Sequence, residues 1–154
     1  MTRILFVCHG NICRSPMAEF VFKALAQKQG VSERFYVQSA ATSSEEICGT
    51  VGNPVYPPAK AELSKHGISC AGKRAVQLRK SDYEKYDLFV CMDDNNIRNI
   101  FRIFDADPQN KVCKLLDFTS GGDVADPWYT RDFGAAYRDI EQGCTALLKK
   151  LMKE

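Results

Sequence analysis

The chain has 154 residues, of which 45% are hydrophobic and 26% charged, and its formal net charge is +2. These values are typical of a folded globular protein, and they argue against a disordered chain and against a strongly basic nucleic-acid-binding surface. A chain of this length can bury a core without metal or disulfide support. We therefore predict a single domain over residues 1–154.

The first predicted elements alternate between short apolar runs and longer segments of helical periodicity, and this pattern continues along the whole chain. In chain order, strands are predicted at residues 4–7, 35–37, 88–92 and 112–116. Helices are predicted at residues 17–29, 58–66, 95–104 and 133–152. The alternation predicts an α/β fold with a parallel sheet and helices on both faces.

Several element boundaries carry their own signals. Ser15 and Pro16 predict a helix N-cap followed by proline at the first helical position, and residues 81–84 predict a capping box. His66 and Gly67 predict the end of a helix. The loops at residues 42–57 and 119–131 are rich in Ser, Gly, Pro and Asp, and each is long enough to be functional.

Cysteine content and the first residues bear on location. The chain has seven cysteines at irregular spacings and only two histidines, which indicates reduced thiols without a zinc site. The first apolar run covers only residues 4–8, which is too short for a signal peptide or a membrane span. We expect a monomeric cytoplasmic protein that binds no metal, cofactor or nucleic acid and has no membrane span.

The segment CHGNICRS, residues 8–15, joins the first predicted strand to the first predicted helix. A loop of this length before a helix N-terminus turns backbone N–H groups inward and forms an anion-binding nest. Cys8 stands at its entrance, where the amides, the helix dipole and Arg14 favour the nucleophilic thiolate. The guanidinium of Arg14 suits two oxygens of a phosphate. The segment therefore predicts a phosphate loop with a reactive cysteine.

Other residues of this segment support the same interpretation. Gly10 permits close approach of the backbone, Asn11 tolerates left-handed geometry, and Ser15 can donate a hydrogen bond to the Cys8 sulfur. The spacing of Cys8 and Arg14 is weak by itself, because about 0.4 such matches per chain are expected by chance. The alternative is a buried cysteine that ends a strand and a solvated arginine; the surrounding strand, turn and Ser-Pro pair argue against it.

The segment FVCHGNICRSPMAE, residues 6–19, and the late segment DPWY, residues 126–129, resemble the low-molecular-weight protein tyrosine phosphatases. The resemblance covers nearly the whole chain and includes SAAT, HGI and CMDDNN after later elements. It implies a three-layer α/β sandwich of flavodoxin-like or Rossmann-like type, with four parallel strands and the phosphate loop after the first. It also implies hydrolysis of phosphotyrosine in protein substrates, without metal or cofactor.

The same resemblance implies the roles of the catalytic residues. Cys8 is the nucleophile that forms a cysteinyl phosphate, Arg14 clamps the phosphate, and Asp126 is the general acid and then the base. The implied substrate-binding residues are His9, Gly10, Asn11, Ile12, Cys13, Ser15, Trp128 and Tyr129.

The residues themselves leave alternatives open for several of these roles. Asp126 before proline is also a typical turn initiator, but the aromatic pair Trp128 and Tyr129 beside it favours a slot for a flat ring. His9 fits an exposed rim residue or a substrate contact. Cys13 fits a packed small residue, or a thiol that traps an oxidised Cys8 as a reversible disulfide.

Two further residues have a local and a family interpretation. Asp93 at the end of the third strand is predicted as a helix N-cap, and the family places it near the phosphate loop in a supporting role. His66 is predicted as a cation at a helix C-terminus, whereas the family places it beneath the loop, bonded towards Asn11.

Four other functions were weighed against the residues. A thiol-dependent arsenate reductase needs a pair of resolving cysteines beyond the third strand, and Cys91 has no partner before Cys113. A phosphocarrier lacks the arginine and the acid, and a binding module without activity would have lost Cys8 or Asp126. Phosphoarginine phosphatases of this family carry threonine in place of Ile12 and lack the aromatic pair.

The loop at residues 42–57 departs from the family pattern. Glu45 and Glu46 stand where other members place an aromatic residue after the serines. We therefore expect the site to disfavour acidic residues next to the phosphotyrosine.

Overall fold

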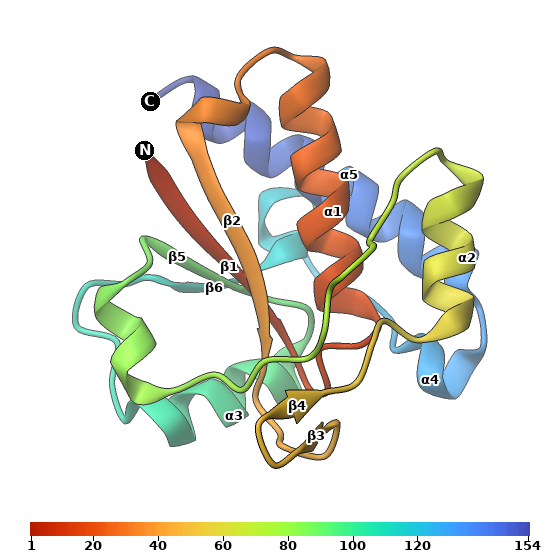
Figure 1. Ribbon diagram of the computed structural model, residues 1–154. Helices are drawn as coiled ribbons and strands as arrows, with labels where there is room; N and C mark the ends of the chain where they lie inside the picture. The colour runs from red at the N-terminus through yellow and green to blue at the C-terminus, as the bar shows by residue number, and fades with distance from the viewer.

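A parallel sheet of four strands organises the computed structural model, which describes residues 1–154 (Figure 1). The strand order is β2-β1-β5-β6, with all neighbours parallel. The strands are β1 (Thr2–Cys8), β2 (Phe35–Ala41), β5 (Leu88–Cys91) and β6 (Val112–Lys114). The predicted four-stranded parallel sheet is therefore confirmed.

Helices cover both faces of this sheet (Figure 1). One face carries α1 (Arg14–Lys28), α2 (Pro57–Lys65) and α5 (Phe133–Met152), and the other carries α3 (Asp94–Phe104). The remaining elements are the short helix α4 (Pro127–Thr130), the hairpin strands β3 (Ile47–Cys48) and β4 (Val51–Gly52), and the 3-10 helices η1 (Ser32–Arg34), η2 (Lys80–Glu84) and η3 (Leu115–Phe118). None of the helices has the length and apolarity that crossing a membrane requires.

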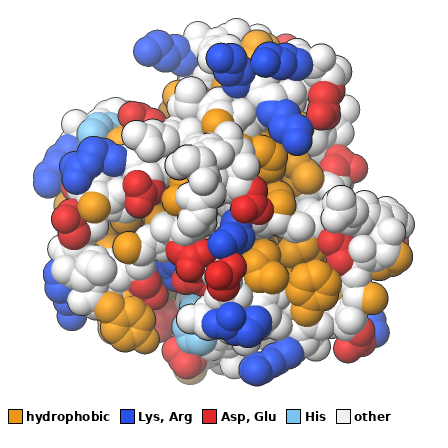
Figure 2. Space-filling model, turned by 180° about the vertical axis from the view of Figure 1, so that it is seen from behind, with side chains coloured by type: hydrophobic (Ala, Val, Ile, Leu, Met, Phe, Trp, Pro, Cys, Tyr) orange, Lys and Arg blue, Asp and Glu red, His pale blue; other side chains and the backbone are white.

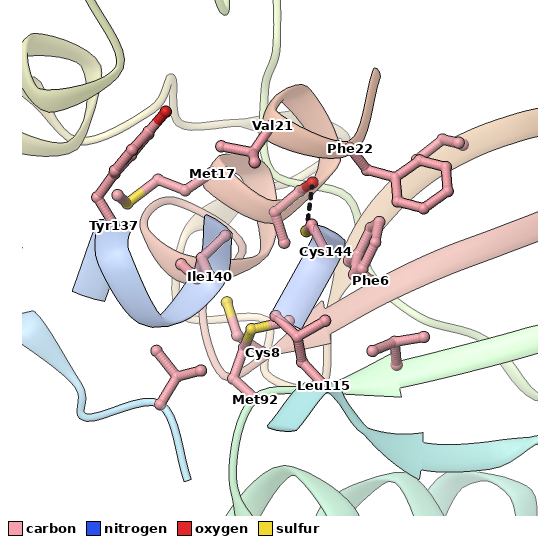
Figure 3. Packing of buried hydrophobic residues seen from close by; sticks show 14 of the residues in the cluster. Phe6, Cys8, Met17, Val21, Phe22, Met92, Leu115, Tyr137, Ile140 and Cys144 are labelled. Carbon is pink, nitrogen blue, oxygen red and sulfur yellow. Dashed lines mark hydrogen bonds between the residues drawn. The ribbon is translucent and has the colours of Figure 1, made fainter. Parts of the chain in front are cut away.

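Alternation along β1 separates the core into two clusters. Ile4 and Phe6 belong to the larger cluster beneath α1 and α5, whereas Leu5 and Val7 belong to the smaller one on the face that α3 covers. In Figure 3, side chains from α1 and α5 converge over Phe6, and Cys8 belongs to the same cluster. The thiol of Cys8 is therefore placed on the α1 side of the sheet.

Three predicted boundaries are wrong in detail. Helix α1 begins at Arg14, so Ser15 lies in its first turn and is not the N-cap; its hydroxyl accepts a hydrogen bond from Asn11 instead. The predicted capping box at 81–84 lies two residues earlier, at 79–82, where Asp82 accepts the backbone N–H of Arg79 at 2.8 Å. The predicted strand at 112–116 ends at Lys114 and continues as η3.

Other boundaries are confirmed. Helix α2 ends at Lys65, and Gly67 follows in the left-handed region with φ 73°. The two long loops contain short regular elements: the hairpin β3–β4 lies within 42–57, and α4 lies at the end of 119–131. Both loops lie beyond the carboxyl end of the sheet, on the same side as the start of α1 (Figure 1).

The strand order creates a topological switch point between β1 and β5. The chain leaves β1 for β2 on one side and later returns to β5 on the other side of β1. Ligand sites of open α/β sheets lie beyond the carboxyl ends of strands at such a point. Cys8 ends β1, and Asp93 follows β5 and precedes α3, so both residues lie at the switch point.

Candidate active site

The loop between β1 and α1 surrounds the sulfur of Cys8 with hydrogen-bond donors. The backbone N–H of Asn11 donates to Cys8 Sγ at 3.3 Å, and Ser15 Oγ lies 3.0 Å from the same sulfur. Asn11 has φ 58°, the left-handed geometry that the sequence predicted for it. The side chain of Cys8 is buried, at 3% exposed, in the wall of a cavity. The loop therefore places an N–H and a hydroxyl group beside the sulfur.

The side chain of Asn11 sets the direction of the hydrogen bonds beneath this loop. Its Nδ2 donates to Ser15 Oγ at 2.7 Å and to Ser39 Oγ at 2.9 Å, while its Oδ1 accepts the N–H of Val76 at 3.0 Å. Because the Ser15 oxygen already accepts from Asn11, its own proton is free to point at the Cys8 sulfur. Asn11 and Ser15 therefore lie under the loop and do not line the cavity.

The network continues to a buried ion pair that sequence reasoning missed. Ser39 Oγ donates to Glu19 Oε1 at 2.6 Å, and Lys73 Nζ lies 3.6 Å from that oxygen and donates to Ser39 O at 2.9 Å. The side chains of Glu19 and Lys73 are 2% and 7% exposed. Burial lowers the pKa of Lys73, and the negative charge of Glu19 opposes that effect. From Glu19 the network continues to the surface, because the partly exposed Lys23 donates from Nζ to Glu19 Oε2 at 2.6 Å.

Arg14 is a buried cation held by three residues from two segments. Its Nη1 donates to Asp93 Oδ2 at 2.7 Å and to Val124 O at 2.8 Å, and its Nη2 lies 3.4 Å from Asp126 Oδ2. The guanidinium is 3% exposed. Burial lowers its pKa, but Cys8, Asp93 and Asp126 together raise the pKa of Arg14 above its ordinary value. The guanidinium is therefore charged and fixed in orientation.

Asp93 acts both as a helix N-cap and as a partner of the residues around the phosphate loop. Its Oδ1 accepts the N–H of Asn96 at 2.8 Å and caps α3, while its Oδ2 binds Arg14. Asn96 in turn accepts the backbone N–H groups of Met92 and Asp93. The N-cap prediction and the expected contact near the phosphate loop are both confirmed.

The family interpretation of His66 is wrong, whereas its predicted place at the C-terminus of a helix is confirmed, because His66 is the C-cap of α2. Its Nε2 lies 3.1 Å from Glu62 Oε2, and its ring stacks on Tyr137 with the centroids 3.8 Å apart. The partners of the Asn11 side chain are instead the hydroxyl groups of two serines and a backbone N–H, which leave no role for an imidazole there.

Asp126 both starts a helix and faces the cavity. Its Oδ1 accepts the N–H of Trp128 at 3.0 Å and caps α4, so the turn-initiator interpretation is correct. Its Oδ2 points towards Arg14, and its side chain is 28% exposed. The Asp126 carboxylate is thus held at Oδ1 by the N–H of Trp128, whereas its Oδ2 faces Arg14.

A cavity of about 230 Å³ opens above Cys8. Its lining residues are Cys8, His9, Gly10, Ile12, Cys13, Arg14, Glu45, Glu46, Asp126, Trp128 and Tyr129. Every predicted site residue except the two beneath the loop therefore lines one cavity. Trp128 is 46% and Tyr129 82% exposed, so this aromatic pair forms an open wall.

The hairpin loop supplies the opposite, acidic wall. The backbone N–H groups of Thr42 and Ser43 donate to the carbonyl oxygens of Cys8 and His9 at 3.0 Å, which fixes the loop beside the site. Glu45 Oε2 lies 3.1 Å from His9 Nε2 at the rim. A Cβ at Gly10 would lie 3.3 Å from Glu46 Cγ, so the glycine leaves room for the Glu46 side chain beside the loop, and its role in the approach of a ligand to the backbone stays a prediction.

Cys13 differs chemically from Cys8. It is 7% exposed, and burial, with smaller effects from Cys8 and Asp126, raises its pKa to about 12. Cys13 is therefore a protonated thiol at neutral pH. Its role in trapping an oxidised Cys8 stays a prediction.

Removing the Ser15 hydroxyl tests whether Ser15 donates its hydrogen bond to the Cys8 sulfur. We expect Ser15→Ala to slow alkylation of Cys8 by iodoacetamide at pH 7 by about tenfold, because a hydrogen bond to a charged sulfur is lost. The measurement is the rate at which the peptide containing Cys8 gains the label, followed by mass spectrometry. Ser64→Ala, an exposed serine in α2, is the matched control.

The same experiment contains an internal control. Cys13 should remain unlabelled at pH 7, because its pKa of about 12 leaves almost no thiolate. An unchanged labelling rate of Cys8 in Ser15→Ala would contradict the hydrogen-bond direction described above.

Comparison with known proteins agrees with this geometry. The family model described as low molecular weight phosphotyrosine protein phosphatase matches residues 3–154. The low molecular weight protein-tyrosine-phosphatase YfkJ of Bacillus subtilis is 36% identical over 157 residues, which cover 100% of this chain and 98% of YfkJ. The human low molecular weight phosphotyrosine protein phosphatase is 38% identical over 156 residues, covering 96% of this chain and 94% of the human protein.

Solved structures extend the likeness to three dimensions. The crystal structure of YfkJ superposes with a TM-score of 0.93 at 35% identity and covers 99% of this chain and 96% of its own. A structure of the arginine phosphatase YwlE superposes with a TM-score of 0.86 at 28% identity, covering 99% and 97%. Since the family match spans nearly the whole sequence, this chain belongs to the low molecular weight phosphotyrosine protein phosphatase family.

Proposed function

We propose that this chain hydrolyses phosphotyrosine in proteins through a cysteinyl phosphate on Cys8. The observation that carries the proposal is the sulfur of Cys8, which receives the Asn11 N–H and lies beside Ser15 Oγ in a cavity also lined by Arg14 and Asp126. A nucleophile, a phosphate-binding cation and a proton donor thus share one cavity.

In the first step the thiolate of Cys8 attacks phosphorus, and a sulfur–phosphorus bond forms as the bond to the phenol oxygen breaks. Asp126 gives its proton to that oxygen, so that tyrosine leaves as the neutral phenol. The loop amides and Arg14 bind the three equatorial oxygens, whose charge is the main demand of phosphoryl transfer.

In the second step water attacks the cysteinyl phosphate and the sulfur–phosphorus bond breaks. Asp126, now a carboxylate, accepts the proton of the water, and Cys8 leaves as the thiolate that Ser15 and the Asn11 N–H stabilise. Inorganic phosphate is released. Because Asp126 ends protonated and Cys8 ionised, the enzyme returns to its starting state.

The cavity walls support an aromatic substrate. Ile12, Trp128 and Tyr129 present apolar surface around the entrance, which suits a phenyl ring. Phosphoarginine phosphatases of this family carry threonine in place of Ile12 and lack the aromatic pair, so we favour phosphotyrosine over the phosphoarginine that the name of YwlE suggests. The arsenate reductase alternative is disfavoured because Cys91 is fully buried and does not line the cavity.

The wider assignment follows from the same features. We also propose that residues 1–154 act as a single catalytic domain, as a monomer, in the cytoplasm. One continuous sheet with its two core clusters supports the single domain. All seven cysteines are free thiols, which is typical of a reducing compartment.

A panel of phosphorylated peptides tests the proposed function. Peptides of one sequence that carry phosphotyrosine, phosphoserine or phosphoarginine are compared by kcat/KM for phosphate release. We expect phosphotyrosine to exceed the other two by about a hundredfold, because phosphoserine is too short to reach the loop and phosphoarginine carries no aromatic ring to pack against the walls. Cys8→Ser should release no phosphate. Equal or faster release from phosphoarginine would contradict the proposal.

The acidic wall predicts a preference within phosphotyrosine substrates. Peptides with lysine beside the phosphotyrosine should have kcat/KM values about threefold above peptides with glutamate there, a size typical of exposed charge pairs. Double substitution of Glu45→Gln and Glu46→Gln should remove most of the difference, as should high salt.

Glu33→Gln is the matched control, because Glu33 is exposed in η1 and does not line the cavity. This variant should keep the preference for lysine. If it removes the preference as fully as the double variant does, the acidic wall is not its origin.

A further inference from the structure

Lys114, the last residue of β6, bridges two carboxylates from distant segments. Its Nζ lies 2.8 Å from Asp94 Oδ1 at the start of α3 and 2.9 Å from Asp123 Oδ1 in the loop that precedes α4. The Lys114 side chain is only 17% exposed. Acidic side chains also gather around a basic side chain near the centre of the face in Figure 2. Neither carboxylate belongs to the cavity.

Each partner of Lys114 adjoins a residue that holds Arg14. Asp94 follows Asp93, whose carboxylate binds the Arg14 guanidinium, and Asp123 precedes Val124, whose carbonyl accepts from the same guanidinium. The Lys114 bridge therefore joins the same two segments as the Arg14 contacts. Together the two cations tie the loop before α4 to the start of α3.

The loop has few other attachments at this point. Val124 is the only buried residue between Leu116 and Pro127, and its N–H donates to Met92 O at 2.9 Å. Gly121 and Gly122 have φ 95° and 101°, and a Cβ on either would meet no atom within 4 Å. The stretch before Asp123 is thus exposed and unconstrained by packing, so Val124 and the Lys114 bridge fix the course of the chain towards Asp126.

We propose that Lys114 is a positioning residue that holds Asp126 over the cavity by tying Asp123 to the start of α3. The inference rests on the proposed role of Asp126 as general acid. Asp123 lies three residues before Asp126, so a shift of the chain at Asp123 changes where the short segment that leads to the Asp126 carboxylate begins. Proton transfer to a leaving group depends steeply on such displacements, whereas exposed ion pairs contribute little to global stability.

Lys114 and Asp94 are both ionised in this bridge. The hydrogen bonds that Lys114 donates to Asp123 and then to Asp94 raise the pKa of Lys114, and the latter hydrogen bond is the main reason that the pKa of Asp94 is lowered. Both groups therefore stay ionised at any pH at which a cysteine phosphatase turns over. Lys114→Met removes the charge and keeps much of the side-chain volume.

The test compares leaving groups. For Lys114→Met we expect kcat/KM to fall about fivefold with phenyl phosphate and less than about twofold with p-nitrophenyl phosphate, whose anion leaves without a proton. Asp123→Asn should give the same pattern, and the double variant should be no worse than either single variant, because both changes remove one bridge. Lys114→Arg should restore the phenyl phosphate rate.

Two reference variants complete the experiment. Lys80→Met removes an exposed ion pair of the same length, 2.8 Å to Asp105, and should leave both rates unchanged. Asp126→Asn should show the same selective loss as Lys114→Met, only larger. Thermal unfolding of each variant reports whether the fold is retained, and Asp123→Asn keeps the test decisive if Lys114→Met does not fold.

The outcomes separate the inference from the proposed function. Equal losses with both substrates in Lys114→Met and in Asp123→Asn, beside a selective loss in Asp126→Asn, would overturn the positioning role alone. An Asp126→Asn enzyme without a selective loss would overturn the general-acid role and, with it, the role of Lys114.

Discussion

The burial of one positive charge, that of Arg14, is the constraint on which the arrangement of the site depends. A guanidinium that is 3% exposed must be paired, because an unpaired charge in the protein interior is very costly. Its partners come from the start of α3 and from the loop before α4. Satisfying Arg14 therefore brings together the phosphate loop, the strand-end aspartate and the candidate acid.

A second constraint operates beneath the loop, where one amide group decides the direction of several hydrogen bonds. Asn11 can reach Ser15, Ser39 and the N–H of Val76 at once only in the left-handed backbone region, at φ 58°. This geometry also directs its own backbone N–H at the Cys8 sulfur. The loop conformation that binds an anion and the one that satisfies the buried amide are thus the same conformation.

Much of this arrangement follows from local sequence. Continuously apolar runs identified the central strands, because both faces of β1 and β5 are covered. The segment from Cys8 to Ser15 identified the loop, because its residue types match the demands of an anion nest. What local sequence predicted least well was the pairing of distant polar residues.

The failures have a common physical origin. The buried pair of Glu19 and Lys73 depends on contacts among α1, β2 and a segment without regular structure, and no periodicity marks that segment. Ser15 looked like an N-cap because its competing partner, Asn11, is visible only in three dimensions. The bridge at Lys114 likewise joins residues from three separate elements.

In the proposed mechanism Cys8 carries the phosphoryl group during turnover. The most direct measurement is acid quenching of Asp126→Asn during reaction with p-nitrophenyl phosphate, followed by mass spectrometry of the digested protein. The activated substrate needs no acid for the first step, and loss of the base slows the second, so the intermediate should accumulate. The account predicts one phosphate on the peptide that contains Cys8, bound to sulfur. Phosphate on any other residue, or turnover without a phosphoenzyme, would contradict it.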